Sequence, residues 1–133
     1  MTSKFTSAST IKGVRGLGAA RSGVHHWWMQ RVTAAGNLLL MAWFIISLIL
    51  LPDLSFESVT AWVARPLVAI PLLLLILSSF WHARLGVQVV LEDYVHTEGM
   101  KLLATLALNF FILGTAAVAI FSLLSIAFGG PRA

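Results

Sequence analysis

The sequence of 133 residues contains no cysteine. The chain therefore has no disulfide, no thiolate metal site, no iron–sulfur cluster of its own and no covalent C-x-x-C-H haem attachment. Charged residues are also scarce, at 11%, against roughly 25% in a soluble domain. Hydrophobic residues make up 59% of the chain, and the mean hydropathy is +0.91. These values exclude a free cytosolic enzyme and also a disordered chain, which would be poor in apolar residues.

Three stretches are long and apolar enough to cross a bilayer, which takes about 20 residues. Residues 32–51 and 102–130 carry no charge, and residues 66–91 are interrupted only by His82 and Arg84. Pro52 and Pro66 mark helix ends between the first two stretches. We therefore predict an all-α membrane protein whose three-helix anchor domain covers residues 23–133, with spans at about 27–51, 66–91 and 101–128. Four aromatic residues near the span ends fit the membrane interface: Trp27, Trp28, Trp62 and Tyr94.

The basic residues predict the orientation of these spans. Six lie on the side of the N-terminus and the second loop: Lys4, Lys12, Arg15, Arg21, Arg31 and Lys101. Only Arg65 and Arg132 lie on the other side. The positive-inside rule then places the N-terminus in the cytoplasm. Residues 1–22 are expected to form a basic cytoplasmic tail against anionic membrane lipid, although a transit peptide has a similar composition. The basic residues are too few and too dispersed for a nucleic-acid partner.

The second span contains a histidine, which is unusual inside a membrane and suggests a function. At 100° per residue, His82, Gly86 and Asp93 fall on one stripe of the helix. An imidazole followed one turn later by glycine suits a flat macrocycle, because the missing side chain leaves room for it. Ser78 or Ser79 could then accept from the other ring N–H and fix the tautomer. Two alternatives remain open, a histidine hydrogen-bonded to a neighbouring helix and a proton relay.

Other polar residues lie near the cytoplasmic ends of the spans. Asp93 and Tyr94 follow His82 by about 16 Å along the axis, where an acid beside a phenol could serve quinone reduction or simply end the helix. Arg31 opens the first span at the same depth and suits a carboxylate, a propionate or a lipid headgroup. Arg84 points about 200° away from His82, so we expect a structural role for it, through a partner carboxylate or by reaching toward the surface.

Two separated motifs point to one family. Residues 82–95 read HARLGVQVVLEDYV, which is similar to an H-A-x-x-G…D-Y-V pattern. Gly23-Val24-His25 is followed by Arg31 and then Val-Thr-Ala. Together with three spans and a basic N-terminus, the chain resembles the smaller of the two hydrophobic membrane anchors of bacterial succinate dehydrogenase (respiratory complex II). His96 departs from the family, which often has a basic residue after D-Y-V.

The resemblance implies a role for four residues. His82 matches an axial ligand of the haem b iron, the second axial histidine coming from the partner anchor, which is the other hydrophobic subunit. Arg31 matches a basic residue near the haem propionates. Tyr94 matches the tyrosine that hydrogen-bonds the ubiquinone headgroup, and Asp93 matches the acid beside it. We therefore expect a haem-binding helical bundle formed with that second anchor.

The resemblance also implies a membrane anchor of succinate:quinone oxidoreductase in the bacterial inner membrane. The chain would not be an enzyme by itself. FAD and the iron–sulfur clusters would belong to the flavoprotein subunit and the iron–sulfur subunit. One alternative is a purely structural anchor without haem. A small proton or ion transporter subunit is a weaker alternative, because the sequence shows no internal repeats or broken helices.

Overall fold

The computed structural model describes residues 20–129, with side chains described from residue 23. This part of the chain contains four helices and no strand: α2 (Ala20–Ile49), α3 (Phe56–Val63), α4 (Pro66–Tyr94) and α5 (Glu98–Phe128). The predicted all-α class is thus confirmed. Most of the predicted cytoplasmic tail, residues 1–19, lies outside the described residues. Helix α2 already begins at Ala20, so the helix extends beyond the predicted span at its N-terminal end.

The three long helices match the three predicted membrane spans. Their apolar segments contain 27, 29 and 31 residues, or about 40–46 Å of helix. That length covers the hydrocarbon core of a bilayer together with its headgroup regions. Helix α4 begins with Pro66. Proline has no backbone N–H, and the first turn of a helix has no internal partner for one, so proline is tolerated there. Helix α5 ends before Gly129. A proline and a glycine thus mark one end of each of these two spans.

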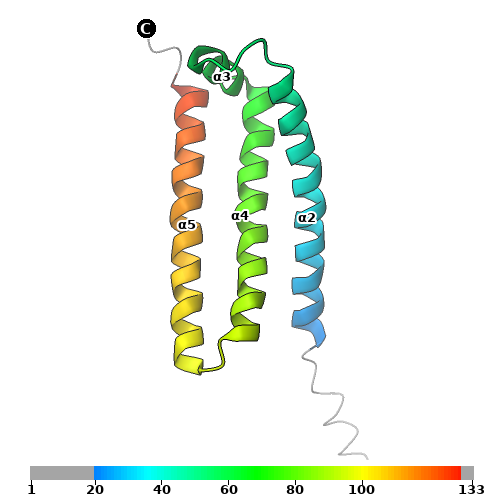
Figure 1. Cartoon of the computed structure of the whole chain (residues 1–133), viewed down its shortest axis with the longest axis vertical. Helices are drawn as coiled ribbons and strands as arrows, with labels where there is room; N and C mark the ends of the chain where they lie inside the picture. Colours follow the sequence, from blue (N-terminus) through cyan, green and yellow to red (C-terminus); the bar gives the residue numbers. More distant parts are fainter. Residues whose placement is uncertain (1–19, 130–133) are drawn as a thin grey trace, which may run out of the picture.

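The long helices stand side by side in a row with α4 in the middle (Figure 1). Helix α4 packs against α2 and α5, whereas α2 and α5 make no contact with each other within residues 20–129. The N-terminal end of α2, the C-terminal end of α4 and the start of α5 lie at one end of the row (Figure 1). A row of three helices encloses little interior. Most of its apolar side chains are therefore exposed in the isolated chain.

The buried core lies at the opposite end, where α3 crosses over α4 and α5 (Figure 1). Its buried residues are Trp62, Val63, Val68, Leu72 and Leu123. The Trp62 ring is only 6% exposed and stacks on Trp43, with the ring centroids 6.4 Å apart. Helix α3 thus folds Trp62 back onto the bundle, and its predicted position at the membrane interface stays a prediction. Trp27 and Trp28 are both exposed, as expected of interfacial residues.

Helix α3 is a short element that the sequence analysis did not predict. Ser55 is its N-cap and accepts a hydrogen bond from the backbone N–H of Ser58 at 3.3 Å. Asp53 accepts hydrogen bonds from both the backbone N–H and the hydroxyl of Ser55. Hydrogen bonds from the side chains of Ser55 and Ser58 and from the backbone of Ser55 hold the pKa of Asp53 below its usual value. The cap fixes where α3 starts, so that its apolar face meets α4 and α5.

Candidate functional site

His82 lies on α4 and faces α2. Its Nδ1 atom is 3.0 Å from the hydroxyl oxygen of Thr33. The Thr33 hydroxyl also lies 2.8 Å from the carbonyl oxygen of Met29, to which it donates its single hydrogen. The Thr33 oxygen is then available to accept from Nδ1–H of His82. This arrangement favours the tautomer in which Nε2 carries no hydrogen and keeps its lone pair for another partner.

The serines of α4 do not fix the imidazole, contrary to prediction. The Ser78 hydroxyl donates to the Thr33 carbonyl at 3.5 Å, and the Ser79 hydroxyl lies 3.5 Å from Oδ1 of Asn37. Both hydroxyls therefore turn across to α2 instead of running along α4 to His82. The hydrogen bond between His82 and a neighbouring helix, one of the alternatives above, is present. It occupies Nδ1 alone, so it is compatible with ligation by Nε2.

Gly86 lies one turn beyond His82, about 6 Å along the axis. An added Cβ at Gly86 would meet nothing within 4 Å. The chain's own side chains therefore leave this space open, as a flat macrocycle beside the imidazole requires. Residues 23–129 contain no group of three or more histidine or acidic side chains that could hold a metal ion. A metal bound by His82 would need its remaining ligands from a macrocycle and a partner subunit.

Asp93 and Tyr94 are the last two residues of α4. The helix stops there because Val95 has an extended backbone (φ −100°, ψ 104°). Tyr94 is 79% exposed, and Asp93 is also exposed. Neither side chain makes a hydrogen bond within the described part of the chain. An acid and a phenol thus lie together at one end of the bundle, open to a ligand or to another subunit.

The structure does not bring Arg31 together with His82. Arg31 is exposed, and its guanidinium carbon lies 5.1 Å from the centroid of the Trp27 ring, one turn earlier on α2. Thr33, which marks the face of α2 toward His82, is about 200° further around the helix. Arg31 therefore points away from the histidine within this chain. Its contact with a haem propionate stays a prediction.

Two polar residues of the spans have roles that the sequence analysis missed. Thr33 holds His82, and Asn109 on α5 accepts a hydrogen bond from Nε of Arg84 at 2.6 Å. Both are polar residues in otherwise apolar stretches, and such residues often form hydrogen bonds between membrane helices. The pairing itself was not visible, because each pair joins two different helices.

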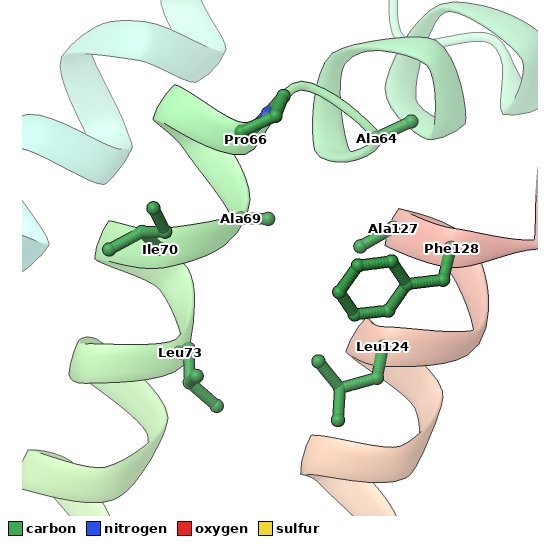
Figure 2. Close-up of a pocket in the computed structure, with 8 residues that line it drawn as sticks. All are labelled: Ala64, Pro66, Ala69, Ile70, Leu73, Leu124, Ala127 and Phe128. Carbon is green, nitrogen blue, oxygen red and sulfur yellow. The ribbon is translucent and has the colours of Figure 1, made fainter.

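A pocket at the α3 end of the bundle lies away from all of these residues. It has a volume of about 210 Å³. Leu124 and the ring of Phe128 on α5 face Ala69 and Leu73 on α4 across it (Figure 2). The complete lining is Ala64, Pro66, Ala69, Ile70, Leu73, Leu124, Ala127 and Phe128. This lining is apolar and offers no group for proton or metal chemistry, and the predicted site residues do not contribute to it.

Comparison with known proteins identifies the family. The sequence model of the succinate dehydrogenase/fumarate reductase transmembrane subunit matches residues 6–116. The chain belongs to this family. It is therefore a membrane anchor subunit of a succinate dehydrogenase complex, and a multi-pass protein of the bacterial inner membrane. The resemblance seen in the sequence is confirmed.

Individual relatives agree with this assignment. The succinate dehydrogenase hydrophobic membrane anchor subunit of Rickettsia bellii is 36% identical over 101 residues, covering 76% of this chain and 81% of that protein. The subunit of the same name from Paracoccus denitrificans is 30% identical over 83 residues, covering 62% and 64%. The one from Coxiella burnetii is 28% identical over 83 residues, covering 62% and 72%. Relatives from several bacterial genera thus carry the same name.

Proposed function

We propose that this anchor subunit supplies one axial ligand of a haem b and part of a site that reduces ubiquinone. His82 is the proposed ligand, and Tyr94 with Asp93 is the proposed quinone contribution. The observation that carries the haem assignment is the hydrogen bond between Nδ1 of His82 and Thr33, which leaves Nε2 available. The second axial histidine would come from the other hydrophobic anchor of the complex.

Thr33 acts on His82 as an orienting residue. Accepting from Nδ1–H fixes the plane of the imidazole and makes Nε2 a better donor to a metal. The open space at Gly86 gives a macrocycle room next to α4. A bound haem b would supply a group that takes up and releases one electron at a time. Arg31, exposed on α2, is the proposed contact for a propionate carboxylate.

Tyr94 and Asp93 are proposed to act on the quinone itself. Reduction of a quinone to a quinol takes two electrons and two protons, and negative charge develops on the carbonyl oxygens. The Tyr94 hydroxyl would donate a hydrogen bond to one of these oxygens, and Asp93 would hold or pass a proton beside it. The electrons would come from iron–sulfur clusters of another subunit, because this chain has no cysteine to bind them.

The proposed orientation places this chemistry at the cytoplasmic face. Tyr94 lies at the same end of the bundle as the N-terminal part of α2 (Figure 1), and the basic residues predict that this end is inside. The peripheral iron–sulfur and flavoprotein subunits would then bind on that side. Because Tyr94 and Asp93 are exposed in the isolated chain, the quinone pocket would be completed by these partners.

A reduced-minus-oxidised optical spectrum of membranes tests the haem assignment directly. Membranes containing all four subunits are compared with membranes that lack only this chain. We expect a b-type band in the first and its loss in the second, since a haem held without covalent bonds depends on its axial ligands. A complex that contains this chain but shows no such band would instead identify a haem-free anchor, in which the His82–Thr33 bond only joins α2 to α4.

Thr33→Val should weaken the binding of haem to the complex without unfolding α2. Valine has nearly the same shape but cannot accept from Nδ1–H, and loss of such an orienting partner typically lowers metal affinity about 10–100-fold. We expect less haem per complex and a higher midpoint potential, because a less basic imidazole stabilises ferric iron less. Both are measured by redox titration of the purified complex. Thr33→Ser keeps the hydroxyl and should stay near wild type; a valine variant with wild-type haem content and potential would exclude this role.

A further inference from the structure

Arg84 is a cation deep within the membrane-spanning part of the bundle. It precedes Tyr94, at the end of α4, by about 15 Å along the axis. Helix α4 is about 43 Å long and a hydrocarbon core is about 30 Å thick, so an upright helix centred in the bilayer would place the backbone of Arg84 about 8 Å inside the hydrocarbon. Asn109, its neighbour on α5, lies at a similar distance from the start of that helix at Glu98. A charge at this depth is costly unless it is paired.

The contacts within this chain hold Arg84 but do not neutralise it. Its Nε–H donates to Oδ1 of Asn109 at 2.6 Å, and its guanidinium carbon lies 5.3 Å from the centroid of the Trp81 ring. The Nη1 and Nη2 atoms have no hydrogen-bond partner within residues 23–129, and neither atom is buried. The guanidinium is therefore fixed in position, with its outer pair of nitrogens presented at the surface of the α4–α5 pair.

No acidic residue of the chain lies at the depth of Arg84. The five acidic residues are Asp53, Glu57, Glu92, Asp93 and Glu98. On α4 the first acid after Arg84 is Glu92, about 12 Å away along the axis. The Glu92 carboxylate accepts a hydrogen bond from Nε2 of Gln88 at 2.9 Å. A carboxylate that pairs with Arg84 would therefore have to come from outside this chain.

We propose that Arg84 binds a carboxylate side chain from a transmembrane helix of a partner subunit, seated against the α4–α5 pair. The Nη1 and Nη2 atoms of Arg84 can donate two parallel hydrogen bonds to the oxygens of one carboxylate. A lipid phosphate would lie at the headgroup layer, out of reach while Nε stays on Asn109. His82 points about 200° away from Arg84, so a group bound there faces the other side of α4. The proposal needs only that the anchor assembles with other subunits, and it is independent of the haem and quinone assignments.

Chemical cross-linking of the assembled complex tests this contact. Arg84→Lys replaces the guanidinium with an amine, and dicyclohexylcarbodiimide, which enters membranes, activates buried carboxyl groups for amide formation. We expect a cross-linked product of this chain with a partner subunit, joined at position 84 to an Asp or Glu as mapped by mass spectrometry. Arg84→Gln, which has no amine there but keeps Lys101, should give no such product. An assembled Arg84→Lys complex that yields no cross-link at this position would overturn the proposal.

A second variant covers the case in which Arg84→Lys does not assemble. Asn109→Asp places a carboxylate of the chain itself against Arg84, which would compete with the partner's carboxylate and leave it unpaired within the membrane. We expect roughly tenfold less assembled complex, measured by co-purification of the subunits. Asn109→Ala adds no charge and should have a much smaller effect. Equal assembly of Asn109→Asp and Asn109→Ala would contradict an external carboxylate.

Discussion

In the assembled complex, His82→Ala is expected to abolish most of the b-type haem absorbance. The proposed haem would be held without covalent bonds, so it would depend on its axial ligands and on packing. Loss of a partner that merely orients a ligand already lowers metal affinity about 10–100-fold. Loss of the ligand itself should lower it further. The measurement is the reduced-minus-oxidised spectrum per mole of purified complex, with the amount of this chain determined in the same sample.

Two controls separate loss of the ligand from loss of the fold. His96→Ala removes an exposed histidine in the loop after α4 and should leave the spectrum unchanged. Succinate oxidation with an artificial electron acceptor should largely survive His82→Ala, because we expect the flavin and the iron–sulfur clusters in other subunits. An unchanged haem spectrum in an assembled His82→Ala complex would rule out His82 as the ligand. It would leave His82 as a helix-packing residue held by Thr33.

The sequence predicted the spans because their signal is local. A bilayer requires long uninterrupted apolar helices, so residue composition alone locates α2, α4 and α5. Pro66 and Gly129 then set helix ends through their own backbone preferences. Helix α3 was missed because it is too short for a span. Its signals, the N-cap at Ser55 and the apolar spacing of Val59, Trp62 and Val63, are weak when considered singly.

Contacts between helices could not be predicted in the same way. Helical periodicity placed His82 on a stripe of α4, but it could not show which residue of another helix meets that stripe. Periodicity therefore suggested Ser78 and Ser79 on the same helix as partners, whereas the structure pairs His82 with Thr33 on α2. Likewise Arg84 was expected to find a partner, and Asn109 on α5 became visible only once α4 and α5 were placed together.

The arrangement of the helices also explains why part of the proposed site is exposed in this chain. A row with α4 in the middle buries residues mainly at the α3 end, around Trp62 and Leu72. At the other end Asp93 and Tyr94 are exposed and unpaired within the described residues. Exposed side chains of this kind are what an anchor needs if it contributes only part of a site shared with other subunits. The role of Tyr94 must therefore be tested in the whole complex.

Tyr94→Phe is expected to lower quinone-linked turnover about tenfold or more. The change removes one hydroxyl and keeps the ring, and Tyr94 is 79% exposed in the chain, so folding should be little disturbed. A donor aimed at a developing negative charge is worth roughly 3 kcal/mol in comparable sites, and about 1.4 kcal/mol corresponds to a factor of ten in rate. Haem content should stay at the wild-type level, because His82 lies about 18 Å from Tyr94 along α4.

The decisive measurement is the ratio of quinone-linked to dye-linked succinate oxidation in a single preparation. Dye reduction would report the flavoprotein and iron–sulfur subunits, whereas quinone reduction would also require the proposed site at the end of α4. Asp93→Asn should lower the same ratio, because an amide cannot hold or release the proton. His96→Ala, in the exposed loop after Val95, is the matched control and should leave the ratio unchanged. If Tyr94→Phe also has the wild-type ratio, Tyr94 is only an interfacial aromatic, and the partner subunits alone form the quinone site.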